Sequence, residues 1–253
     1  MQSEKQWDPE AVLLLGAGLM VSMSAGALAN LALFRLFPDL TAVQQKFYGF
    51  LISSVSLQVV GLILIHFFLR QHELSWAGFL GLKGSGLWRA IALGVAVVAV
   101  ALPLTVGLNE VCKILLTQFA GNVETQPTMK ILESSVSLPQ RIYFGFTAIV
   151  LAPLLEEILF RAILYRGIKQ HGYPKLALFG SAVLFGAIHL SLLTFVPLTV
   201  LAIILALLYD KADSLMAPII AHSIFNAANF ALYLYQDEAT HWLHEAARRL
   251  QQF

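Results

Sequence analysis

The stretch Ile149-Val-Leu-Ala-Pro-Leu-Leu-Glu-Glu-Ile-Leu-Phe-Arg-Ala-Ile-Leu-Tyr165 is an apolar run with three ionisable side chains in its interior. Such groups cost roughly 2.5–3.5 kcal/mol each at the centre of a bilayer, so they indicate a functional site by default. Glu157 and Arg161 are spaced i, i+4 on one helical face, where an acid and a base can pair for structural reasons alone. Glu156 projects about 100° away from Glu157, which leaves it as the carboxylate available for chemistry.

The composition of the chain places this stretch in a membrane protein. Of 253 residues, 58% are hydrophobic and 12% are charged, whereas soluble domains carry about 25% charged residues. The net charge of +1 and the lack of a basic run exclude nucleic acid as a partner. The single cysteine, Cys112, excludes an intrachain disulfide framework. Acidic residues dominate the first ten positions, which argues against a cleaved signal peptide, so we expect the first hydrophobic segment to remain as an anchor.

The hydrophobic pattern predicts an all-α, polytopic transmembrane helix bundle with about seven spans plus interfacial helices, because a span needs about 20 mostly apolar residues. The predicted spans are residues 11–34, 47–69, 87–108, 142–165, 176–195, the short 197–209 and 215–235. Residues 74–82 and the tail 236–253 are predicted to be interfacial, and residues 109–141 to be the longest extramembrane stretch. Without a repeat or a linker, we expect a single membrane domain over residues 1–253, with a core at 142–235 that carries the motifs.

The orientation of the bundle rests on loop charges. With the N-terminus inside, eight basic residues lie inside and seven outside, which is close to a tie under the positive-inside rule. The dense basic turn around Arg166, Lys169 and Lys175 favours a cytoplasmic N-terminus. We therefore expect an integral, multi-pass protein of a prokaryotic cell membrane.

Further polar residues interrupt the later spans. His189 is the only ionisable residue of 176–195, and the last span carries His222, Asn226 and Asn229 at i, i+4 and i+7, which places all three on one helical face. The helical rise places Glu156, His189, His222 and Asn226 at roughly 12–21 Å from the same membrane face, in the middle of a core about 30 Å thick. Independent packing residues would scatter in depth, so this agreement predicts a site.

The residue types predict hydrolysis by an activated water. A carboxylate beside an imidazole, Glu156 with His189, can hold a water and take its proton. A second histidine with a carboxamide, His222 with Asn226, can donate hydrogen bonds to a developing oxyanion. Glutamate with two histidines is also a catalytic zinc ligand set, here Glu156, His189 and His222. The spacing lacks the H-E-x-x-H pattern, so the sequence favours no metal and no cofactor, with zinc as the alternative.

Three motifs in order resemble the CPBP family of intramembrane proteases, which includes CAAX prenyl endopeptidases and bacteriocin-processing or immunity proteins. They are Glu156-Glu157-x-x-x-Arg161, Phe185-x-x-x-His189 and Ala217-Pro-Ile-Ile-Ala-His222-Ser-Ile-Phe-Asn226. The resemblance implies a glutamate mechanism in which Glu156 and His189 position the water while His222 and Asn226 stabilise the oxyanion. It implies supporting roles for Glu157 tied to Arg161 and for Phe185 in packing. For the zinc alternative, Asn226 and Asn229 are the candidates to brace His222, and Asn229 is counted among the supporting residues.

The leading hypothesis is an intramembrane endopeptidase that acts on a membrane-associated or lipidated protein or peptide. The alternative is a non-catalytic membrane scaffold or bacteriocin self-immunity protein that keeps the polar cluster for packing. A transporter has less support, because the chain shows no inverted repeat. The sequence identifies neither the natural substrate nor the oligomeric state.

Overall fold

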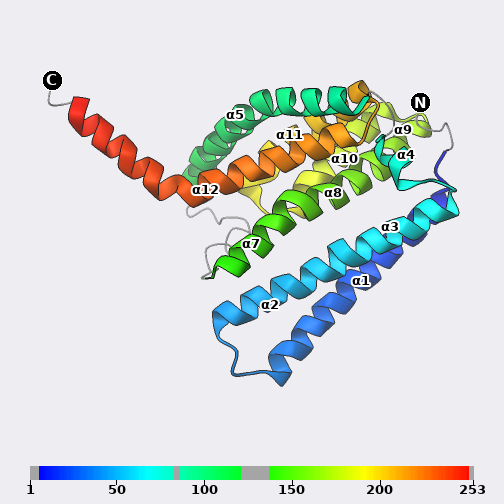
Figure 1. Ribbon diagram of the computed structural model, residues 1–253, viewed down its shortest axis with the longest axis horizontal. Helices are drawn as coiled ribbons and strands as arrows, with labels where there is room; N and C mark the ends of the chain where they lie inside the picture. Colours follow the sequence, from blue (N-terminus) through cyan, green and yellow to red (C-terminus); the bar gives the residue numbers. More distant parts are fainter. Residues whose placement is uncertain (1–5, 83–85, 121–136, 251–253) are drawn as a thin grey trace.

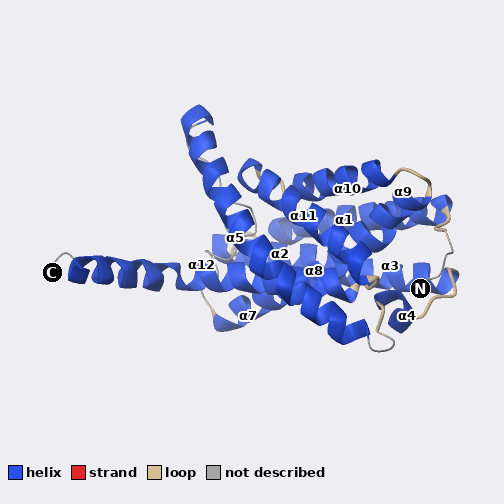
Figure 2. Cartoon of the chain, turned by 90° about the horizontal axis from the view of Figure 1, so that it is seen from above, coloured by secondary structure: helices blue, strands red, loops and turns tan. Residues whose placement is uncertain are grey.

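The structure, a computed structural model, describes residues 6–82, 86–120 and 137–250, and of residues 236–250 only the helical backbone. Within these ranges the chain forms helices joined by turns, with no strand (Figures 1 and 2). This confirms the predicted all-α membrane bundle.

Six helical segments are long and apolar enough to cross a membrane: Pro9–Leu36, Ala42–Gln71, Gly86–Phe119, Leu138–Gln170, Leu192–Ala212 and Met216–Tyr235. A seventh apolar helix, α10 (Pro174–Ile188), is shorter than a span. The predicted lengths of the fifth and sixth spans were therefore wrong. The break falls after Ile188 because Leu190 adopts a left-handed backbone (φ 51°), whereas Pro197 lies inside α11 (Leu192–Ala212).

The third span was also predicted too short. Helix α5 (Gly86–Ala120) continues through Pro103 and includes residues 111–119. These residues were predicted to belong to an extramembrane stretch. An apolar helix tolerates a proline when neighbouring helices satisfy the freed backbone groups. Residues 121–136 of that stretch lie outside the described residues.

The N-terminal half forms a helical hairpin along one side of the bundle (Figure 1). Helix α1 (Pro9–Leu36) starts at the capping residue Asp8 and packs against the continuous α2 (Ala42–Ser54), η1 (Val55–Val59) and α3 (Val60–Gln71). The short α4 (Trp76–Leu80) follows. At Gly61 an added Cβ would lie 3.1 Å from Leu155 and 3.3 Å from Leu19. The glycine therefore lets the hairpin approach the helix that carries the glutamates.

That helix is continuous from Leu138 to Gln170, with alternating α and π turns. Its parts are α7 (Leu138–Phe146), η2 (Thr147–Leu151), α8 (Ala152–Glu157), η3 (Ile158–Tyr165) and α9 (Arg166–Gln170). Together with α10, α11 and α12 (Met216–Leu250) it encloses the polar residues, while α5 packs on α11 and α12. The most apolar windows of this helix and of α11 are 39% buried, against 22% for the first three spans. The polar residues thus lie on the inner helices of the bundle.

Candidate active site

A buried ion pair lies at the centre of the site. Glu157 Oε2 lies 2.9 Å from Arg161 Nε, and the two side chains are 0% and 2% exposed. The guanidinium lies 4.8 Å above the ring centre of Phe185 and donates a long hydrogen bond of 3.5 Å to the carbonyl of Ala202. Removal of one partner would leave an uncompensated charge in an apolar interior. The pairing that the sequence spacing predicted is therefore present.

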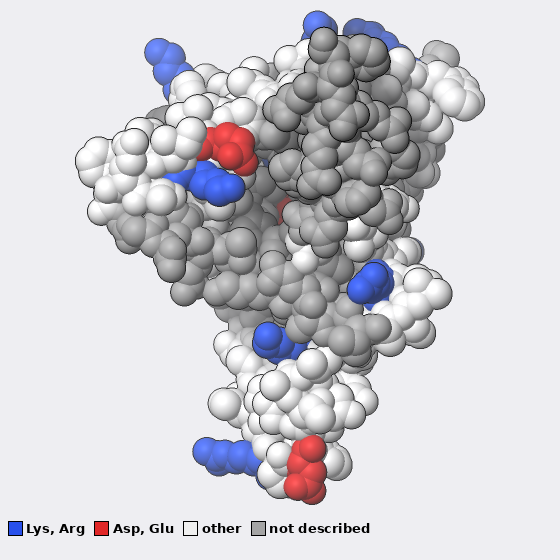
Figure 3. All heavy atoms as spheres, turned by 90° about the vertical axis from the view of Figure 1, so that its left-hand side faces the viewer, with Lys and Arg blue, Asp and Glu red and all other residues white. Residues whose placement is uncertain are grey.

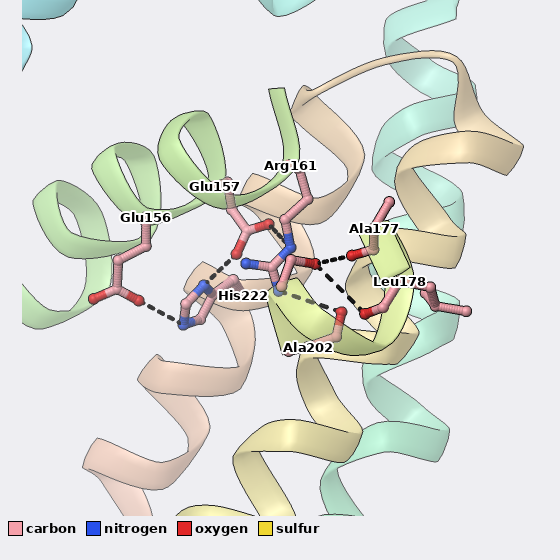
Figure 4. A network of polar contacts seen from close by, with 8 residues as sticks. Glu156, Glu157, Arg161, Ala177, Leu178, Ala202 and His222 are labelled. Atoms are coloured by element: carbon pink, nitrogen blue, oxygen red, sulfur yellow. Dashed lines mark hydrogen bonds and ion pairs between the residues drawn. The ribbon is translucent and has the colours of Figure 1, made fainter. Parts of the chain in front are cut away.

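His222 lies between the two glutamates (Figure 4). Its Nδ1 lies 2.7 Å from Glu157 Oε1, and its Nε2 lies 3.8 Å from Glu156 Oε2. Because Glu157 is ion-paired with Arg161 and accepts, the shorter contact makes Nδ1 the donor and fixes the orientation of the ring. The Nε2 atom then points toward Glu156.

Glu156 differs from Glu157 in partners and in exposure. Its only ionic neighbour among the described residues is His222, at a distance too long for a hydrogen bond. The side chain is 24% exposed, whereas Glu157 is fully buried. Figure 3 shows the surface seen from the left-hand side of Figure 1, with acidic and basic side chains of the described residues in colour. Glu156 is thus the carboxylate whose oxygens remain available to accept a hydrogen bond or a proton.

His189 lies at the C-terminus of α10, where it caps the helix. Its Nδ1 donates a hydrogen bond of 2.7 Å to the carbonyl of Phe185, which leaves Nε2 available. The Phe185 ring is fully buried, with its centre 4.9 Å from the His189 ring and 5.8 Å from the His222 ring. In the part of the chain that the structure describes, no hydrogen bond or ion pair joins Glu156 to His189, so a shared water would have to bridge them.

The two asparagines of α12 have separate partners. Asn226 Nδ2 donates a hydrogen bond of 2.8 Å to the carbonyl of Ala148 in η2, and the second hydrogen of this amide remains for another acceptor. Asn229 Nδ2 donates to the carbonyl of Phe225, one turn earlier on its own helix. The bracing of His222 by Asn226 and Asn229, considered for a zinc site, is not seen in this arrangement, because both amides donate to backbone carbonyls and Glu157 holds the ring.

The zinc alternative was tested against the positions of its ligands. Among the residues that the structure describes, no group of three or more His, Cys, Asp or Glu side chains converges enough to hold a metal ion. The contact of His222 Nδ1 with Glu157 leaves Nε2 as the ring atom that could bind a metal. Glu156, His189 and His222 therefore do not fit a three-ligand zinc site in this arrangement.

The alternation of α and π turns was not predicted from the sequence. The segments η2 and η3 flank α8, which carries both glutamates. π-Helical turns are rare and occur frequently at functional sites. Apolar periodicity does not distinguish them from α turns, so no sequence signal was available.

Comparisons with known proteins agree with the residue motifs. Residues 138–228 match the family described as "Type II CAAX prenyl endopeptidase Rce1-like". The chain is similar to a Bacillus subtilis (strain 168) protein named "Putative membrane peptidase YdiL", with 26% identity over 128 residues, 51% of this chain and 50% of that protein. The chain thus aligns with about half the length of that relative. No solved structure matches. The family match and the relative confirm the resemblance to CPBP-family proteases and support a membrane peptidase.

Proposed function

We propose, for a chain whose residues 138–228 match the family described as "Type II CAAX prenyl endopeptidase Rce1-like", an intramembrane endopeptidase whose nucleophile is a water activated at Glu156. One observation carries the proposal. Of two adjacent carboxylates, Glu157 is neutralised by Arg161 and held by His222, while Glu156 is partly exposed beside Nε2 of the same histidine. A carboxylate without a hydrogen-bond partner and next to an imidazole is suited to act as a general base.

In the proposed reaction Glu156 accepts a proton from the water as its oxygen attacks the carbonyl carbon of the scissile bond. His189, whose Nε2 is free, orients the water from the other side. The resulting oxyanion accepts hydrogen bonds from the second amide hydrogen of Asn226 and from Nε2–H of His222, which in the proposed reaction carries a proton on both ring nitrogens. Glu156 then returns the proton to the leaving nitrogen, the C–N bond breaks, and the free carboxyl and amine products form.

We assign a positioning role to three further residues, Glu157, Arg161 and Phe185. Glu157 fixes the ring of His222, and Arg161 pairs with Glu157 inside an apolar bundle. The Phe185 ring contacts both histidines and the guanidinium, so its packing sets their separation. We assign Asn229 no chemical role, because its amide is bonded to its own helix.

The proposed substrate is a membrane-associated or lipidated protein or peptide, because the site lies on the inner helices of an apolar bundle.

We further propose that the N-terminus is cytoplasmic, in a prokaryotic cell membrane, so that the basic turn near α9 faces the cytoplasm. A phosphatase or fluorescent-protein fusion at the N-terminus reports this side. An active phosphatase fusion would show that the N-terminus lies outside the cytoplasm and would contradict the proposed orientation.

The experiment that tests the function uses purified full-length protein in liposomes. Two quenched-fluorescence peptides serve as probes, one with a prenylated cysteine near its C-terminus and one with an apolar transmembrane segment and no lipid. We expect cleavage of at least one probe, with a single site identified by mass spectrometry, and no cleavage by Glu156→Gln. Cleavage of neither probe by the wild type, or equal cleavage by both proteins, would favour the scaffold or immunity alternative.

A further inference from the structure

The N-terminal segment contacts the helix that carries the glutamates through one buried side chain. Trp7, which precedes α1, is 2% exposed, and its Nε1–H donates a hydrogen bond of 2.7 Å to the carbonyl of Ala162. The guanidinium of Arg166 lies 5.0 Å from the centre of the indole. Trp7 lies far outside the residues that match the family, 138–228.

Ala162 lies within the π-helical segment η3, directly after Arg161. A π turn uses i→i+5 hydrogen bonds and is less common than the α turn, so it needs outside contacts to persist. Relaxation of η3 to α geometry would rotate Arg161 relative to Glu157, because the two turns differ in residues per turn. A donor fixed on the Ala162 carbonyl opposes that rotation.

A continuous series of contacts leads from Trp7 to the site. The indole binds the Ala162 carbonyl, the neighbouring Arg161 is paired at 2.9 Å with Glu157, and Glu157 binds His222 at 2.7 Å. Each step is a hydrogen bond, an ion pair or a peptide bond. A change at Trp7 therefore reaches the imidazole that faces Glu156.

Packing alone does not require this hydrogen bond. The indole ring lies among Phe68, His72 and Phe79, with ring centres 5.2, 5.2 and 6.4 Å away. A phenylalanine would supply most of this aromatic contact. Only the N–H group gives Trp7 a directed contact with the backbone of η3, and a buried tryptophan N–H usually has a partner.

We propose that Trp7 is a positioning residue whose indole N–H holds η3 in the π-helical register that aligns Arg161, Glu157 and His222. The catalytic part of this inference rests on the proposed peptidase function. The structural part, the register of η3, does not.

The test replaces the indole N–H with sulfur and keeps the shape of the ring. 3-Benzothienylalanine is incorporated at position 7 by stop-codon suppression, and the same substitution at Trp88, which is 76% exposed, is the matched control. At position 7 we expect kcat for the cleaved probe to fall about ten-fold with KM within about two-fold, since misplacement at a site lowers rate more than binding. At position 88 we expect both constants to stay within about two-fold of the wild type.

A second control separates packing from the hydrogen bond. Phe79→Leu removes a ring that packs on the indole and leaves the N–H donor in place. We expect it to lower the melting temperature while kcat stays within about two-fold of the wild type. An equal loss of kcat in this variant would assign the effect of Trp7 to packing and overturn the proposal.

Amide hydrogen exchange of the peptide that covers Ile158–Tyr165 gives a readout that does not depend on activity. We expect faster exchange in this segment for the position 7 analogue and wild-type exchange for the position 88 analogue. Unchanged exchange in the position 7 analogue overturns the proposal, whatever the rate. If the wild type cleaves neither probe, the proposed function fails, and faster exchange still supports the register role of Trp7.

Discussion

Two polar clusters interrupt the apolar interior of this bundle, and they differ in how their members are satisfied. The neutral cluster consists of Ser54, Gln58 and Tyr143, where the Ser54 hydroxyl lies 3.0 Å from Gln58 Oε1 and 2.8 Å from the Tyr143 hydroxyl. The charged cluster consists of Glu156, Glu157, Arg161 and His222. Both are next to or within π-helical segments, η1 and η3.

The neutral cluster joins the N-terminal hairpin to α7 through hydrogen bonds between its own members. The charged cluster contains two carboxylates and one arginine, so Glu156 has no full counter-charge and no hydrogen bond among the described residues. Polar groups in a membrane interior must find partners whatever their purpose. The comparison indicates that unused charge, rather than polarity alone, distinguishes a chemical site from packing.

The largest expected effect is that of Glu156→Gln, which removes the base and keeps the shape of the side chain. We expect cleavage of the peptide probe to fall by about 10²–10⁴-fold, the usual contribution of general base catalysis. The melting temperature should change little, since the ion-pair contact of Glu156 among the described residues is the long one with His222, at 3.8 Å. The control is Glu110→Gln, at a carboxylate that is 59% exposed and only 3.9 Å from Lys113. Activity of Glu156→Gln close to that of the control would remove Glu156 from the role of base.

The next effect is on stability. Arg161→Met leaves Glu157 charged and buried without its ion-pair partner, so we expect a loss of about 3–5 kcal/mol in unfolding free energy. Addition of Glu157→Gln should recover much of this loss, because the pair is then replaced by neutral groups. Thermal and denaturant unfolding in detergent measure both variants.

The control for the buried pair is the ion pair of Lys169 with Asp210, at 2.6 Å and with side chains 42% and 35% exposed. Lys169→Met should cost at most about 1 kcal/mol, because solvent screens such pairs. If Arg161→Met were no more destabilising than Lys169→Met, the buried pair would not be a main support of the site.

A smaller effect is expected in the neutral cluster. Gln58→Leu removes the acceptor of the Ser54 hydroxyl and should cost about 0.6–1.7 kcal/mol, the range found for hydrogen bonds between membrane helices. Probe cleavage should remain within about two-fold of the wild type, since the residue lies outside the charged cluster. A ten-fold loss of kcat at unchanged stability would instead make the neutral cluster part of the site.

The smallest expected effect is that of metal removal. We expect cleavage to persist after exhaustive chelation, because Glu156, His189 and His222 do not converge on one point in the part of the chain that the structure describes. The zinc content of the protein is determined by elemental analysis before and after chelation, together with the cleavage rate. Stoichiometric zinc that is lost and restored together with activity would contradict the proposed mechanism.

The candidate site could be recognised from the sequence to the extent that its members follow helical spacing. The i, i+4 relation of Glu157 and Arg161 predicted their ion pair, which the structure contains. The alignment of Asn226 and Asn229 with His222 on one face did not predict their partners, because spacing along one helix does not identify an acceptor such as the Ala148 carbonyl on another helix. The ring of His222 is held by Glu157, a residue 65 positions earlier in the chain.

Composition and apolar periodicity by themselves determined that this chain is a helical membrane bundle, because a bilayer admits only segments whose backbone is satisfied within a helix or a closed barrel. They also determined which residues are unusual there, since Glu156, Glu157 and Arg161 interrupt an apolar run. Only the tertiary structure decided which carboxylate is neutralised, where α10 ends, and that Trp7 contacts the carbonyl of Ala162. These features depend on main-chain atoms and on contacts between distant helices, and neither has a signature in the local order of side chains.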